Sequence, residues 1–176
     1  MLERIPHALL AISPVSSEWV AVHKRILSAG GIADARVRVL PQGRNEAENQ
    51  ARYQVIDLVL DPLPFGGVNG TLEALDMNVP VVTLVGRRHG ERSTYSILAN
   101  LGVTQTIAHS GSEYVAIAER LAADAAFRSE VKATIRAGLA DSPLTDMDAY
   151  ARNLEEAYRQ ALQARAPVAL AVAGDG

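Results

Sequence analysis

The 176-residue sequence contains no cysteine, which excludes disulfide frameworks, thiolate zinc sites and cysteine nucleophiles. No run of about 18 apolar residues occurs, so no segment is predicted to span a membrane. The first residues, Met1-Leu2-Glu3-Arg4-Ile5-Pro6, lack the basic start and the apolar stretch of a signal peptide. We therefore expect a cytoplasmic protein. No two histidines have the spacing of metal ligands, and we expect neither a metal site nor a cofactor.

The sequence also lacks an excess of basic residues. Lysine and arginine total 17 against 20 for aspartate and glutamate, giving a net charge of −3. This balance argues against a nucleic-acid-binding protein, which normally carries clustered positive charge. Hydrophobic residues (48%) and charged residues (21%) have the proportions of a soluble globular domain. We expect one domain over residues 1–165 and a disordered tail over residues 166–176, where neither caps nor a hydrophobic period occur.

Short apolar runs alternate with longer amphipathic ones along the chain. Strands are predicted at residues 8–12, 37–40, 55–61, 79–85 and 104–108, and helices follow them from residue 16 or 17, and at 45–53, 71–77 and 91–101. Three further helices are predicted around 114–121, 125–139 and 147–162. Strands that are apolar on both faces and separated by helices indicate a parallel sheet covered on two sides. The predicted fold is α/β, with about five parallel strands and a helical C-terminal region.

Ligands of such sheets bind beyond the carboxyl ends of the strands, so the turn between 62 and 71 is the first candidate site. Gly66, Gly67 and Gly70 would let the backbone approach a ligand, and a helix beginning near Asn69 would direct free amides at an anion. Glu73, in the first turn of that helix, would accept hydrogen bonds from sugar hydroxyls. A plain strand-to-helix turn explains the same glycines about equally well. The spacing is neither a Walker loop nor the dinucleotide fingerprint.

A cluster of cations, Arg87-Arg88-His89-Gly90-Glu91-Arg92, follows the predicted strand 79–85. Such a cluster neutralises a diphosphate or is simply a solvated loop. We favour the solvated interpretation for Arg87 and Arg88. We favour the diphosphate interpretation for Arg92, which is predicted to lie inside the following helix.

The stretch Asp61-Pro62-Leu63-Pro64-Phe65-Gly66-Gly67-Val68-Asn69-Gly70-Thr71-Leu72-Glu73-Ala74-Leu75 resembles the donor-binding motif of the protein O-GlcNAc transferase family, glycosyltransferase family 41. The resemblance extends over most of the chain to about residue 162. Pro64-Phe65-Gly66 with Asn69-Gly70 is most similar to the bacterial branch that glucosylates asparagines of adhesins. The flank from Gly86 to Arg92 is more similar to the O-GlcNAc transferase branch.

This resemblance implies a GT-B glycosyltransferase, of which the chain would be the second Rossmann-like domain, the one that holds the nucleotide of a UDP-sugar. Val68, Asn69 and Gly70 stand where the O-GlcNAc branch has His-Thr-Thr around the diphosphate, leaving backbone amides up to Thr71 and the Asn69 side chain to bind it. Glu73 falls where the family has an acidic residue on the ribose. The segment Arg44, Asn45 and Glu46 falls where uracil is held. Glu46 replaces a lysine frequent in the family, and Arg92 matches an arginine after the next strand.

The resemblance begins inside the second domain, so the acceptor-side domain and the family's catalytic lysine would precede Met1. The implied function is therefore donor binding, with UDP-glucose or UDP-N-acetylglucosamine as donor and a protein as acceptor, and the chain alone would be inactive. A degenerate domain that serves as an interaction module is the first alternative, and a UDP-sugar epimerase is the second. The face that would meet the missing domain is expected to promote self-association.

Overall fold

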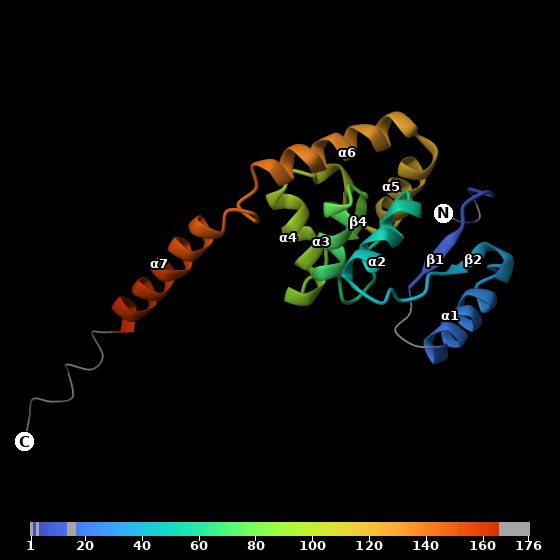
Figure 1. Ribbon diagram of the computed structural model, residues 1–176, viewed down its shortest axis with the longest axis horizontal. Coiled ribbons are helices and arrows are strands. Elements are labelled where there is room, and N and C mark those ends of the chain that lie inside the picture. The colour runs from blue at the N-terminus through green and yellow to red at the C-terminus, as the bar shows by residue number, and fades with distance from the viewer. Residues whose placement is uncertain (1, 3, 14–16, 166–176) are drawn as a thin grey trace, which may run out of the picture.

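The structure, a computed structural model, describes residue 2, residues 4–13 and residues 17–165 (Figure 1). The predicted tail over residues 166–176 lies outside the described residues. The elements are β1 (Leu10–Ile12), α1 (Ser17–Ala29), β2 (Val37–Val39), α2 (Glu46–Ala51), β3 (Val59–Leu60), α3 (Asn69–Asp76), β4 (Val81–Leu84), α4 (Ser93–Asn100), β5 (Ile107–Ala108), α5 (Gly111–Ala123), α6 (Ala125–Ala140) and α7 (Met147–Arg165). Short 3-10 helices precede β2, β3, α4 and β5, at Asp34–Arg36, Arg52–Val55, His89–Glu91 and Thr104–Thr106.

The five strands of the described chain are parallel, but they form two sheets rather than the single sheet expected. One sheet pairs β1 with β2, and Leu10 lies beside Val37. The other has the order β3-β4-β5, in which Val59 lies beside Val81 and Thr83 beside Ile107. Parallel neighbours joined through helices are the arrangement that the alternating sequence pattern predicts.

The hydrophobic core surrounds β4, whose Val81, Val82 and Thr83 are fully buried. Helices α3 and α4 lie on one side of β4 and α5 lies on the other (Figure 1). Their inward residues, together with those of α6, complete the core: Ala74, Leu75, Ile97, Leu98, Leu101, Val103, Ala118, Leu121, Phe127, Val131 and Ile135. This core fixes the three-stranded sheet and the loops at its carboxyl edge.

Local side chains and left-handed residues set the ends of the helices. Ser110 caps α5 by accepting from the Glu113 amide (3.2 Å), and Asp124 caps α6 by accepting from the Phe127 amide (2.9 Å). Gly31 after α1 (φ +80°) and Gly102 after α4 (φ +72°) adopt the left-handed conformation that closes a helix. The prediction that glycine ends the first helix is thereby confirmed.

Several predicted boundaries are wrong. Only Val59–Leu60 of the strand predicted at 55–61 forms a strand, and Val55 instead ends a 3-10 helix that begins at Arg52. Helix α3 begins at Asn69, as the sequence of the turn predicts, and therefore two residues before the predicted range 71–77. The helix predicted at 91–101 begins at Ser93, because Arg92 has the non-helical angles φ −118° and ψ 1°. Arg92 therefore precedes α4 instead of lying inside it.

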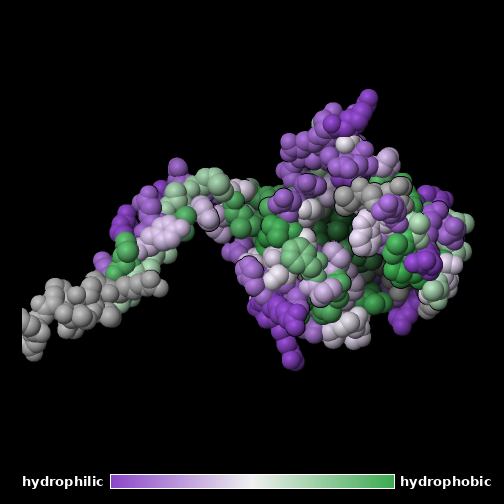
Figure 2. Space-filling view, turned by 90° about the horizontal axis from the view of Figure 1, so that it is seen from below, coloured by the Kyte–Doolittle hydropathy of each residue, from purple (hydrophilic) through white to green (hydrophobic). Residues whose placement is uncertain are grey.

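Two helices carry apolar faces that pack in part or not at all in the described structure. On α1, Val22 and Leu27 are half-buried. Trp19 (56% exposed) and Ile26 (63% exposed) on the same predicted face remain exposed. Helix α7 stands away from the body, and the residues of its apolar stripe are exposed (Figures 1 and 2): Met147, Tyr150, Leu154, Tyr158 and Leu162. No helix among the described residues is both long and apolar enough to cross a membrane.

Candidate functional site

The turn between β3 and α3 presents a row of free backbone amides. Gly66 donates its N–H to the Gly90 carbonyl (3.2 Å) and Gly67 donates to Asp61 Oδ1 (2.8 Å), so these two amides face the protein. The amides of residues 68–71 have no acceptor among the described residues. A helix leaves its first N–H groups unpaired, and their partial positive charge favours an anion. The amides left free in this turn are therefore those of residues 68–71, whereas the amides of Gly66 and Gly67 are paired within the protein.

Close packing inside the protein requires glycine at positions 66 and 67, because a side chain at either position would crowd its neighbours. A Cβ atom at Gly66 would lie 3.0 Å from Asp61 Oδ2, and one at Gly67 would lie 3.1 Å from Thr71 Oγ1. On the sequence alone, these glycines are expected to let the backbone approach a ligand. In the structure, the missing Cβ atoms leave room for Asp61 and Thr71. Gly70 differs, because the nearest atom to a Cβ there is the Tyr53 hydroxyl, at 3.9 Å.

The predicted site side chains of this turn divide into exposed and buried ones. Asn69 is exposed and Val68 is 44% exposed, so both reach solvent above the free amides. Thr71 is 3% exposed and donates its hydroxyl to the Gly67 carbonyl (3.0 Å), so the Thr71 hydroxyl supports the loop from within. Thr71 therefore contributes no side chain to the outward surface of the turn.

Glu73 lies in the second turn of α3, one turn later than predicted, and is half-buried. Tyr53 donates its hydroxyl to Glu73 Oε2 (3.2 Å) and lies 3.3 Å from the Gly70 carbonyl oxygen, which also accepts it. Burial, then the charge and hydrogen bond of Glu73, raise the pKa of Tyr53, and the charge of Arg52 opposes them. Sequence reasoning missed Tyr53, because nothing in its neighbourhood distinguishes it from a core aromatic residue.

The predicted base-binding segment is held by its own polar groups. Asn45 caps α2 by accepting from the Glu48 amide (2.9 Å). The Arg44 side chain forms an ion pair with Glu48 (2.8 Å), and the Arg44 amide also donates to the Glu48 carboxylate (2.8 Å). The side-chain bond, and then the backbone bond, lower the pKa of Glu48. Glu46 is exposed. No hydrogen bond in the described chain joins residues 44–46 to the turn at 66–71, and Tyr53 makes the connection to that turn.

The basic cluster lies directly beside the candidate turn. The Gly66–Gly90 hydrogen bond joins the two segments. A Cβ atom at Gly90 would lie 3.2 Å from the Phe65 ring, so the ring packs closely on Gly90. Glu91 Oε2 accepts from the amides of Arg87 (2.8 Å) and Arg88 (3.1 Å), and the bonds from Arg88 and then Arg87 lower its pKa. The Arg92 guanidinium lies over the Tyr95 ring, 4.9 Å from its centroid. The structure thus joins the two sequence-predicted segments.

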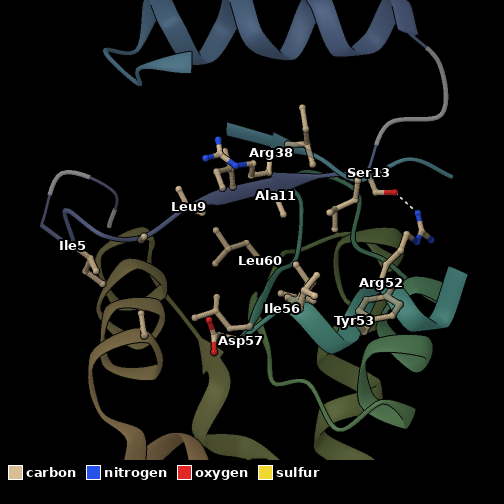
Figure 3. Close-up of a pocket in the computed structure, with 18 of the residues that line it drawn as sticks. Ile5, Leu9, Ala11, Ser13, Arg38, Arg52, Tyr53, Ile56, Asp57 and Leu60 are labelled. Carbon is tan, nitrogen blue, oxygen red and sulfur yellow. Dashed lines mark hydrogen bonds between the residues drawn. The ribbon is translucent and has the colours of Figure 1, made fainter. Parts of the chain in front are cut away.

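A cavity of about 810 Å³ separates the two sheets. Figure 3 shows Ala11 of β1 and Leu60 of β3 on opposite sides of it, and Figure 2 shows a hollow with hydrophobic walls in the body. Arg52 donates a hydrogen bond to Ser13 at the carboxyl end of β1 (Figure 3). Tyr53 lines this cavity and also reaches Glu73, so one end of the cavity meets the candidate turn. In the described part of the chain, no group of three or more histidine, aspartate or glutamate residues is arranged to hold a metal ion.

Comparison with known proteins identifies the family. The family described as glycosyl transferase family 41 matches residues 1–154. The chain belongs to glycosyltransferase family 41. The chain is 36% identical over 129 residues, 73% of its length, to the probable UDP-N-acetylglucosamine–peptide N-acetylglucosaminyltransferase SPINDLY of Oryza sativa subsp. japonica. It is 27% identical over 161 residues, 91% of its length, to the UDP-N-acetylglucosamine–peptide N-acetylglucosaminyltransferase of Caenorhabditis elegans.

A solved family structure confirms the fold. An O-GlcNAc transferase variant of Thermobaculum terrenum superposes with a TM-score of 0.84 at 31% sequence identity, covering 90% of this family 41 chain. The expected α/β fold of one half of a GT-B glycosyltransferase is therefore correct. The chain spans 31% of that structure and 14% of each of the two curated relatives above.

Proposed function

We propose that this family 41 chain is the UDP-sugar-binding region of a protein glycosyltransferase and holds the donor diphosphate on the amides of residues 68–71. The observation that carries this proposal is the row of unpaired amides at the start of α3, beside the basic segment 87–92. Backbone amides at a helix N-terminus suit phosphate oxygens, because both the N–H groups and the helix dipole favour negative charge. Asn69 supplies the one exposed polar side chain of this row.

Sugar transfer from such a donor requires stabilisation of the departing UDP. Positive groups directed at the developing charge on a leaving phosphate supply much of that stabilisation. Arg92 serves this role in the proposal, because the Tyr95 ring and the Gly86 carbonyl, 3.4 Å from Arg92 Nη1, hold it after β4. The acceptor protein, which must be held close to the sugar, would be bound by parts of the enzyme outside this chain.

The nucleoside end of the donor is assigned to Tyr53, Glu73 and the segment 44–46. Glu73 accepts one hydrogen bond, from Tyr53, and a carboxylate has further lone pairs for the ribose hydroxyls. The half-buried Tyr53 ring, at the end of the cavity between the sheets, offers an apolar surface beside it. UDP-glucose and UDP-N-acetylglucosamine are the two donors proposed.

The test is a titration of the full chain with UDP, followed by amide chemical shifts. We expect the largest shifts at residues 68–71 and smaller ones at Arg92 and Glu73. Addition of inorganic pyrophosphate should shift the amides of 68–71 and leave Glu73 unchanged, which separates the diphosphate contacts from the ribose contacts. Competition between UDP-glucose and UDP-N-acetylglucosamine then ranks the two donors.

Absence of any shift at residues 66–73 up to millimolar UDP would refute the proposal and leave a non-catalytic interaction module as the better description. An epimerase is distinguished by its product, because incubation with UDP-N-acetylglucosamine would yield the epimeric UDP-sugar. We expect no such product, because the acids around the turn already accept hydrogen bonds from the protein. Asp61 is buried and accepts from Gly67, and Glu73 accepts from Tyr53. Glu91 accepts from the amides of Arg87 and Arg88.

A further inference from the structure

A buried polar network lies beneath the turn that carries the free amides. Its centre is Asp61, which ends β3 and is 3% exposed. Asp61 Oδ1 accepts from the Gly67 amide (2.8 Å), and Asp61 Oδ2 accepts from the Thr83 hydroxyl (2.7 Å). No ion pair of Asp61 occurs in the described chain, so hydrogen bonds stabilise its buried carboxylate. Burying a carboxylate is costly unless such bonds replace its hydration, so this placement strongly restrains the donors.

The same network holds the other side of Gly67. The Gly67 carbonyl accepts from the Thr94 hydroxyl (2.8 Å) and from the Thr71 hydroxyl (3.0 Å). The two hydroxyls lie 2.9 Å apart, and both threonines are buried. Gly67 is therefore fixed at its N–H by Asp61 and at its carbonyl by two threonines.

Fixing Gly67 fixes the direction of the next amides. With its N–H turned inward onto Asp61, the chain enters α3 with the amides of residues 68–71 unpaired. Without an acceptor at position 61, the half-buried Gly67 amide would lose its partner, and the turn would reorganise to satisfy this donor. The direction of four ligand-facing amides thus depends on one buried carboxylate.

We propose that Asp61 is a positioning residue for diphosphate binding. It touches no ligand, and acts by holding the Gly67 peptide inward so that the amides of residues 68–71 face the phosphate oxygens. Thr94 supports the same peptide from its carbonyl side. This inference rests on the proposed function, since it explains how that binding turn keeps its shape.

The chain offers matched variants for the test. Asp61→Asn keeps an oxygen that accepts from the Gly67 amide, whereas Asp61→Ala removes it. Thr94→Val removes a buried hydroxyl that holds Gly67. Thr106→Val removes a buried hydroxyl that has no hydrogen-bond partner in the described structure, and so serves as the control for Thr94→Val.

Three measurements are made on the full chain, below the melting temperature of every variant: UDP affinity by calorimetry, hydrogen exchange of the Gly67 amide without UDP, and thermal unfolding. Asp61→Ala is expected to weaken UDP binding about tenfold or more, the effect of losing one charge-assisted hydrogen bond. Asp61→Asn and Thr106→Val should bind UDP with an affinity within about threefold of wild type. The loss of UDP affinity in Thr94→Val should lie between those of Thr106→Val and Asp61→Ala. The Gly67 amide should exchange slowly in wild type and Asp61→Asn and rapidly in Asp61→Ala.

The outcomes separate the two proposals. If the wild-type chain binds UDP and Asp61→Ala binds it equally well, the role of Asp61 is overturned and the proposed function is left intact. An equal loss in Asp61→Asn and Asp61→Ala also overturns it, because the retained oxygen would then have no effect. A Gly67 amide that exchanges as fast as that of Val68 in wild type overturns it without reference to UDP. If Asp61→Ala does not fold, the difference in UDP affinity between Thr94→Val and Thr106→Val decides. No UDP binding by wild type refutes the proposed function itself.

Discussion

Replacement of Gly138 by alanine tests the packing that supports the site, because two effects of opposite sign compete at this position. Gly138 lies inside α6, where alanine is favoured over glycine by roughly 0.5–1 kcal/mol. A Cβ atom there would lie 2.2 Å from the Leu101 carbonyl oxygen and 3.1 Å from its carbonyl carbon. Leu101 is 3% exposed and follows α4, so its backbone has little room to move. Such overpacking costs about 1–3 kcal/mol or more.

The steric cost exceeds the helix propensity gain, so we expect Gly138→Ala to destabilise the fold by about 1–2 kcal/mol. Gly111→Ala is the matched control, since Gly111 begins α5 and a Cβ atom there meets nothing within 4 Å. This control should be stabilised by about 0.4–1 kcal/mol through lower entropy of the unfolded chain. Thermal unfolding followed by circular dichroism measures both, and each kcal/mol shifts the midpoint by about 2–4 °C at this size.

Opposite shifts of the two variants are the predicted result. A Gly138→Ala chain that melts at or above the wild-type temperature, with Gly111→Ala behaving as expected, would refute the close approach of α6 to Leu101. The end of α4 would then lack the support of α6 that the structure gives it.

Three further predictions follow from individual contacts. Arg92→Ala should weaken UDP binding about two- to fivefold, the effect of one exposed counter-charge, and the difference should shrink with added salt in a calorimetric titration. Burial, and secondly the charge of Asp61, raise the pKa of Tyr114 in the folded chain above its ordinary value of 10.0. The folded state therefore keeps this proton longer, the stability it contributes is present below about pH 10, and it is lost above that pH at up to about 1.4 kcal/mol per pH unit. Urea unfolding from pH 9 to 11 should show a shallower decline for Tyr114→Phe than for wild type, and equal slopes would contradict this assignment. Removal of residues 147–176 should leave the thermal midpoint within about 2 °C, because Ala149 is the only residue of α7 with a described side chain that is even partly buried, and a larger fall would show that α7 packs on the body.

The elements that the sequence predicts well are those whose own hydrophobic period and caps determine them. Helices α5 and α6 have side-chain caps at Ser110 and Asp124. Strand β4 is apolar except for Thr83, and its first three residues are buried. The strand predicted at 55–61 fails for a tertiary reason. The Tyr53 hydroxyl reaches Gly70 and Glu73 on α3, and residues 52–55 form a turn that an apolar pattern does not reveal.

The site is predictable in outline and not in its internal support. Glycines between a strand and a helix indicate a turn with free amides, and the structure has these amides at residues 68–71. The pattern does not reveal that Gly66 and Gly67 face inward, because their partners Asp61 and Thr94 come from β3 and α4. The one feature of the sequence that indicates this internal support is Asp61, since a carboxylate directly after an apolar strand needs hydrogen-bond donors from elsewhere in the fold.

The charge of the whole chain and the charge at the turn have opposite signs, and the local charge is the one that an anion meets. The chain carries a net charge of −3, yet the Gly66–Gly90 hydrogen bond brings the basic segment 87–92 against the turn. The acids of this region already accept hydrogen bonds from the protein. Asp61 accepts from Gly67 and Thr83, and Glu91 accepts from the amides of Arg87 and Arg88. Glu73 accepts from the Tyr53 hydroxyl. Each of these carboxylates is bound to fixed donors inside the protein, so its field is partly compensated before any ligand arrives. The positive ends of the free amides and the arginine side chains are then left at the surface, and this local charge favours the proposed diphosphate site on a mildly acidic domain.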